Sequence, residues 1–103
     1  MPIREPQILP DEAEAPPERR RAPRYRVLLH DDDRTPMDFV VTVLGKVFQL
    51  PRLEAWRVMY EAHGSGVAQV EVVPLETAEW HVQRAHGQAR AAGYPLTFTI
   101  EAA

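Results

Sequence analysis

Residues Leu29–Val40 have the sequence LHDDDRTPMDFV, in which three aspartates separate an apolar segment from a Thr-Pro pair. The apolar segment, Tyr25–Leu29, has the alternating pattern of a strand. Pro36 is preset for the first turn of a helix, and we expect the side chain of Thr35 to cap that turn. The stretch therefore predicts a short acidic loop held between a strand and a helix, with Met37 at its edge.

The other elements are predicted by hydrophobic spacing and by the glycines and prolines between periodic segments. The predicted strands are Tyr25–Leu29, Val67–Val73 and Leu96–Ile100, and the predicted helices are Met37–Leu50, Pro51–Gly66 and Leu75–Gly93. Their order, βααβαβ, predicts an α+β fold. We expect a two-layer sandwich in which the helices cover one face of a three-stranded antiparallel sheet.

Two further features of the helices concern packing. Small or branched residues at helical spacing predict a buried stripe on the third helix: Ala78, Val82, Ala85 and Ala89. Trp56 and Trp80 are also expected to be packing residues.

The 103 residues divide into two segments of different composition. Six of the ten prolines fall within residues 1–23, where charged residues alternate without apolar periodicity. Such a segment cannot bury enough apolar surface to offset the entropy lost on ordering. We therefore expect a disordered tail over residues 1–23 and one folded domain over residues 24–103.

Composition excludes several classes of function. The net charge of −3 and the pI of about 5.8 argue against nucleic acid as the main partner. The chain has no cysteine and therefore no thiolate metal site. His81 and His86 lie five residues apart, off a common helix face, so we expect no zinc site. The sequence has no apolar run typical of a membrane span or a signal peptide, which favours a cytoplasmic location.

The acidic loop leaves three kinds of site open: a metal site, a catalytic acid pair, and a receptor for an ammonium group. Asp31, Asp32 and Asp33 lack the glycine and the distal glutamate of an EF-hand loop. Ser65 is the only serine and has no evident triad partner. A solvated acidic turn is the non-functional alternative. A free α-amino group with a large apolar first side chain is one ligand that fits carboxylates beside Met37.

Several short segments spread over residues 24–103 form a specific pattern. They are Tyr25–Leu29, Asp32–Val40, Met59–His63, Gly66, Glu76–Glu79 and Tyr94–Leu96. In these segments the chain resembles the ClpS family, adaptors that hand N-degron substrates to a Clp AAA+ protease. The resemblance implies a non-enzymatic protein that needs no cofactor or metal. Its substrates would begin with Leu, Phe, Tyr or Trp.

The resemblance also implies roles for individual residues. Asp31, Asp33 and His63 would hold the α-amino group of the substrate, and Asp32 would bind the backbone just beyond the first residue. Met37 would act as a gate against β-branched side chains. The implied apolar pocket consists of Leu29, Thr35, Pro36, Met37, Val40, Met59, Ala62 and Leu96.

The implied partner is the N-terminal domain of an unfoldase of the ClpA or ClpC type, contacted by Glu76 and His81 of a monomeric adaptor. The proline-rich tail would be engaged by the unfoldase during hand-over. Asp31 replaces the usual Asn, and Ala62 replaces a more common larger aliphatic residue. These departures leave the order of preference among Leu, Phe, Tyr and Trp open. Two alternatives remain: a small metal-binding protein or enzyme that uses Asp31–Asp33, and an interaction module without a ligand pocket.

Overall fold

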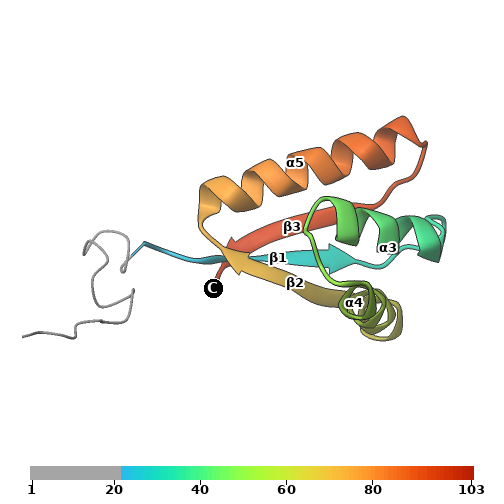
Figure 1. The fold of residues 1–103 in the computed structure, drawn as a ribbon, viewed down its shortest axis with the longest axis horizontal. Coiled ribbons are helices and arrows are strands. Elements are labelled where there is room, and N and C mark those ends of the chain that lie inside the picture. The colour runs from blue at the N-terminus through green and yellow to red at the C-terminus, as the bar shows by residue number, and fades with distance from the viewer. Residues whose placement is uncertain (1–21) are drawn as a thin grey trace, which may run out of the picture.

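The computed structural model describes residues 22–103. The tail predicted over residues 1–23 lies outside this range, apart from its last two residues. The elements in chain order are β1 (Tyr25–His30), α3 (Met37–Lys46), α4 (Arg52–Ser65), β2 (Val67–Val73), α5 (Leu75–Ala91) and β3 (Thr97–Ala102) (Figure 1). The predicted order βααβαβ is confirmed.

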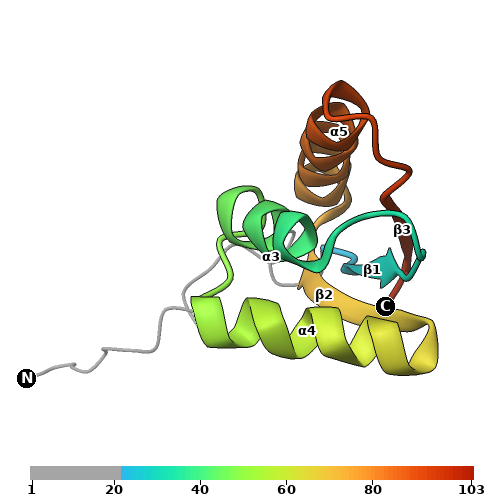
Figure 2. The ribbon, with the colours of Figure 1, turned by 90° about the vertical axis from the view of Figure 1, so that its right-hand side faces the viewer.

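The three strands form one antiparallel sheet in the order β2-β1-β3. The central strand places Leu29 opposite Ala68 of β2 and Phe98 of β3, and all three side chains are buried. The helices are grouped around one side of the sheet (Figure 2). The predicted two-layer α+β sandwich is therefore confirmed.

The core lies between this face of the sheet and the helices. Its fully buried members include branched side chains of α3 and the predicted small-residue stripe of α5, in which Ala78, Ala85 and Ala89 have no exposed surface. Val82 is partly buried against the same core. The prediction that Trp80 packs inside was wrong, because its side chain is 59% exposed beside Arg84. Trp56 is partly buried against the core, as expected.

Helix α3 differs from the prediction in its capping and in its length. Pro36 is the N-cap of α3, and no side chain caps this helix. The expected cap by Thr35 is therefore wrong, because its hydroxyl donates a hydrogen bond to Asp32 Oδ2 instead (2.9 Å). α3 ends at Lys46 rather than at Leu50, although buried side chains continue to Phe48. Hydrophobic spacing alone could not separate that buried turn from the helix.

Candidate functional site

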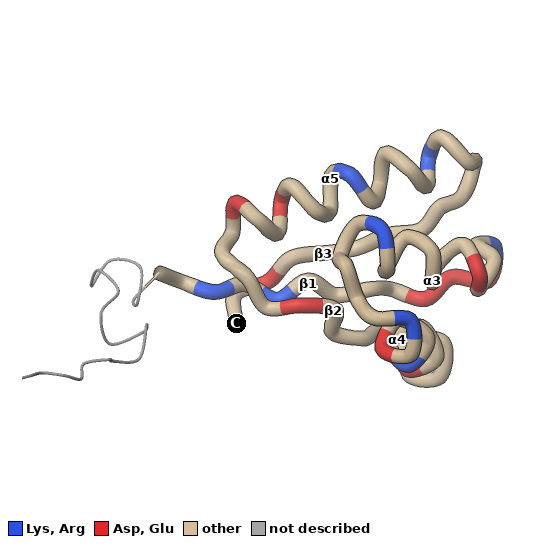
Figure 3. Tube along the Cα trace, viewed as in Figure 1, with Lys and Arg blue, Asp and Glu red and all other residues tan. Residues whose placement is uncertain are grey.

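The acidic loop joins the end of β1 to the start of α3, and its aspartates form a negative segment there (Figure 3). Asp32 holds this loop in shape. Its Oδ1 accepts hydrogen bonds from the backbone N–H groups of Arg34 (2.9 Å) and Thr35 (2.7 Å). Its Oδ2 accepts the hydroxyl of Thr35, a residue that is itself buried. Such side-chain-to-backbone bonds replace the backbone pairing that a loop lacks.

These contacts also determine the charge of Asp32. Partial burial alone would raise the pKa of its carboxyl group. The hydrogen bonds from Arg34 and Thr35, together with the positive charge of Arg34, outweigh that effect and lower the pKa below the usual 3.8. Asp32 is therefore a carboxylate at neutral pH, and two of its three hydrogen bonds fix the backbone.

Asp31 connects this loop to the end of α4. Its backbone N–H donates to the carbonyl oxygen of Gly66 (3.0 Å). Gly66 has a φ of 93°, a left-handed conformation that favours glycine, and its N–H closes α4 on the carbonyl oxygen of Ala62 (2.7 Å). The side chain of Asp31 lies with Oδ1 3.6 Å from Nδ1 of His63, in the last turn of α4. Both side chains remain solvent-accessible.

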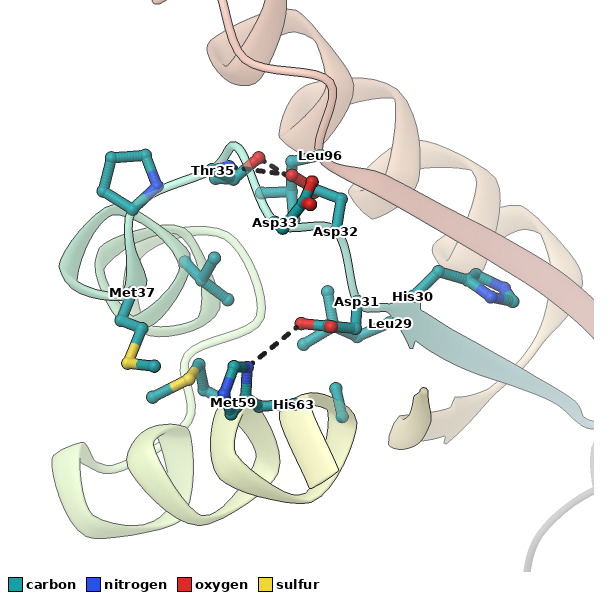
Figure 4. Close-up of a pocket in the computed structure, with 13 residues that line it drawn as sticks. Leu29, His30, Asp31, Asp32, Asp33, Thr35, Met37, Met59, His63 and Leu96 are labelled. Atoms are coloured by element: carbon teal, nitrogen blue, oxygen red, sulfur yellow. Dashed lines mark hydrogen bonds and ion pairs between the residues drawn. The ribbon is translucent and has the colours of Figure 1, made fainter. Parts of the chain in front are cut away.

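A cavity of about 280 Å³ opens between this loop, the start of α3 and the second half of α4 (Figure 4). It is lined by Leu29, His30, Asp31, Asp32, Asp33, Thr35, Pro36, Met37, Val40, Met59, Ala62, His63 and Leu96. Every residue that the resemblance assigned to substrate binding lines this one cavity.

The inner wall of the cavity is apolar and well packed. Leu29, Met59, Ala62 and Leu96 are each at most 4% exposed. Met37, by contrast, is 39% exposed and lies at the mouth. In Figure 4 the thioether groups of Met37 and Met59 approach the same space from α3 and α4. The cavity therefore combines a deep apolar wall with a polar, acidic rim.

His30 is the one lining residue that sequence reasoning missed. Its ring points away from the acidic loop in Figure 4, and its Nε2 lies 2.6 Å from Oγ1 of Thr99 on β3. The position of His30 directly before Asp31 is the sequence signal that could have identified it as a lining residue. His30 and Thr99 are 69 residues apart, and their contact depends on the pairing of β1 with β3, which cannot be read from a single sequence.

The two residues assigned to the unfoldase contact lie on α5 and do not line the cavity. Glu76 is exposed in the first turn. His81 is partly buried, with Nδ1 2.7 Å from Oε2 of Glu71 on β2 and its ring edge-on to Phe48. His81 is thus engaged within the domain, whereas the side chain of Glu76 is exposed.

The described residues were also compared with the requirements of a metal site and of a membrane-spanning helix. Within residues 22–103, no three His, Asp or Glu side chains are grouped closely enough to hold a metal ion together. In the same part of the chain, none of the helices combines the length and apolar character that crossing a membrane requires.

Comparison with known proteins places these features in a family. The family model for the ATP-dependent Clp protease adaptor protein ClpS matches residues 20–99. The ClpS adapter of Nitratidesulfovibrio vulgaris (strain Miyazaki F) is 48% identical over 82 residues, which cover 79% of this chain and 82% of the relative. ClpS 2 of Mesorhizobium japonicum is 45% identical over 85 residues, covering 82% of this chain and 84% of the relative.

A solved structure agrees with the sequence relatives. Agrobacterium tumefaciens ClpS2 bound to L-phenylalaninamide superposes with a TM-score of 0.78 at 40% sequence identity. The match covers 81% of this chain and all of that chain. The chain therefore belongs to the ClpS family of ATP-dependent Clp protease adaptor proteins.

Proposed function

We propose that this adaptor binds the free α-amino group and the bulky apolar first side chain of N-degron substrates. The observation that carries the proposal is a cavity whose apolar wall meets an acidic rim at Asp31 and Asp33. L-phenylalaninamide, the ligand of the solved relative, carries a free amine and an apolar side chain on the same carbon atom. Its amide stands in for the first peptide bond of a protein substrate.

The rim suits an ammonium group. An α-ammonium has three N–H donors, and the carboxylates of Asp31 and Asp33 and an unprotonated ring nitrogen of His63 would supply acceptors for them. Each charge-assisted hydrogen bond contributes about 1.5–3 kcal/mol, and burial of one Leu or Phe side chain contributes a similar amount. After the cost of association, the sum corresponds to roughly micromolar affinity. Such affinity allows an adaptor to release its cargo.

Asp32 has a narrower role in this proposal than the resemblance implied. Its Oδ1 already accepts two backbone hydrogen bonds, and its Oδ2 accepts one. A carboxylate oxygen has two acceptor sites, so only Oδ2 has one left for an N–H of the substrate backbone. Asp32 therefore serves first to hold the loop and second to contact the substrate.

The apolar wall determines which first residues are accepted. Met37 stands at the mouth, where a branched β-carbon of Val or Ile would meet its side chain. Ala62, with its small side chain, leaves room on the α4 side for Leu, Phe, Tyr or Trp. Selectivity would then arise from steric exclusion of β-branched first residues as much as from favourable contacts with the accepted ones.

We further propose that the adaptor delivers its cargo to an AAA+ unfoldase of the ClpA or ClpC type. The exposed Glu76 at the start of α5 is the contact residue that the geometry favours. His81 would act indirectly, since its ring is held by Glu71. In this scheme the adaptor makes and breaks no covalent bond, and the protease carries out the cleavage.

Calorimetric titration tests the binding proposal. A peptide with a free N-terminal Phe or Leu is expected to bind with roughly micromolar affinity. The same peptide, N-acetylated, loses the charge and two donors, and is expected to lose most of its affinity. A matched peptide that begins with Ile controls for shape. Equal binding of the acetylated peptide would refute the proposal, and thermal stabilisation by divalent metal alone would favour a metal-binding protein.

A further inference from the structure

Two thioether groups share the cavity but differ sharply in exposure. Met37, the first residue of α3, is 39% exposed, whereas Met59 on α4 is 4% exposed. The chain contains no cysteine and only three methionines, and the third, Met1, lies outside the described residues. Sulfur side chains are the ones that peroxides oxidise most readily, at rates that follow their exposure. Met37 is therefore the accessible sulfur of the folded domain.

We propose that Met37 is a site of reversible oxidation that controls access to the pocket. A peroxide transfers one oxygen atom to the thioether: an S–O bond forms, the O–O bond breaks, and water leaves when the peroxide is hydrogen peroxide. The sulfur is oxidised by two electrons and the peroxide is reduced by two. The product is methionine sulfoxide, which reductases specific for that group convert back to methionine.

The position of Met37 gives this modification a consequence, which rests on the proposed function. The sulfoxide oxygen is a polar acceptor at the mouth of an apolar cavity whose nearby wall includes Val40 and Met59. A bound apolar side chain would cover that oxygen without offering a donor, and burying an unpaired polar group is costly. The oxidised adaptor is therefore expected to bind N-degron substrates more weakly.

The test treats the folded full-length protein with hydrogen peroxide at neutral pH and removes the oxidant with catalase. Mass spectrometry of peptides then reports oxygen uptake at Met37 and Met59 separately. We expect Met37 to gain oxygen about tenfold faster than Met59, in line with its exposure. Calorimetry with a methionine-free peptide that begins with Phe is expected to give about tenfold weaker binding after oxidation at Met37 alone.

Two variants assign the effect to one sulfur. Met37→Leu is expected to keep, after peroxide treatment, whatever affinity it had before treatment. The matched variant Met59→Leu is expected to lose affinity on treatment as the parent does, and a methionine sulfoxide reductase should restore both the parent and this variant. Unchanged affinity of protein oxidised at Met37, or equal oxidation rates at the two residues, would overturn the inference. Failure of untreated protein to bind the peptide would instead overturn the proposed function.

Discussion

Nδ1 of His63 lies 3.6 Å from Oδ1 of Asp31, so the last turn of α4 and the loop after β1 present their polar groups to each other. The hydrogen bond from the N–H of Asp31 to Gly66 fixes the two backbones that carry these side chains. A carboxylate has acceptor sites to spare beyond one histidine. Under the proposed function, an arriving ammonium group would bind between Asp31 and His63 without separating their backbones.

Asp31→Asn is expected to leave the affinity for a Leu peptide within about threefold of the parent, because the amide keeps a carbonyl acceptor and Asp33 keeps the counter-charge. Asp33→Ala, measured in the same calorimetric series, is expected to weaken binding by about tenfold to a hundredfold. Comparison of the two variants separates the effect of losing a negative charge alone from the effect of losing the charge and the hydrogen-bond acceptor together. A large loss in Asp31→Asn would mean that both negative charges are required.

Asp32→Ala is expected to lower the free energy of unfolding by about 1–2 kcal/mol, because it leaves the N–H and hydroxyl of Thr35 without their acceptor. Thermal and denaturant unfolding measure this loss. Asp33→Ala is the matched control, since it removes a neighbouring carboxylate and should leave stability nearly unchanged. Equal stability of both variants would argue against Asp32 as the residue that holds the loop.

Much of the fold could be predicted because its signals are local. Alternation, helical spacing and the prolines before α3, α4 and α5 gave the element order, and the sheet face followed from Val27 and Leu29. The resemblance brought twelve of the 13 cavity residues together, leaving out only His30. These local signals do not show which hydrogen bond a side chain makes when two polar side chains, such as those of Asp32 and Thr35, lie close together in the folded loop.

The wrong predictions for Thr35 and Trp80 have physical causes. Asp32 and Thr35 both favour turns and caps, and only the folded loop reveals that the carboxylate takes the hydroxyl of Thr35. Trp80 lies two positions from the buried Ala78, which places it on the opposite side of α5 from the packed stripe. The pair between His81 and Glu71 joins a helix to a strand, and nothing in the sequence marks it.

Met37→Ala is expected to let peptides that begin with Val or Ile bind, because loss of the thioether arm leaves room for a branched β-carbon. The exposed position of Met37 at the cavity mouth motivates this expectation. Affinities for Ile, Val and Leu peptides, measured side by side, give the change in selectivity. If the variant rejects Ile peptides as strongly as the parent, another residue excludes them.

Deletion of residues 1–23 is expected to leave peptide binding unchanged, since every lining residue of the cavity lies between Leu29 and Leu96. Delivery should be impaired if the unfoldase engages this proline-rich segment. Calorimetry measures the first effect, and degradation of an N-degron reporter by the cognate Clp protease measures the second. Degradation at the full rate would contradict a role of the segment in hand-over.

Protonation of His86 is expected to destabilise the domain in mild acid. Nε2 of His86 accepts the backbone N–H of Phe98 (2.9 Å), which requires a neutral ring. Burial, followed by the positive charge of Arg90, lowers its pKa below 6.5. Because the pKa of His86 is lower in the folded state, the unfolded chain binds more protons at this residue than the folded chain does. The stability that the neutral ring contributes is therefore present above pH 6.5 and is lost as the pH falls through the folded-state pKa. Unfolding temperatures should fall between about pH 7.5 and 5.5, and less steeply in His86→Gln. Equal slopes in parent and variant would assign the loss to other groups.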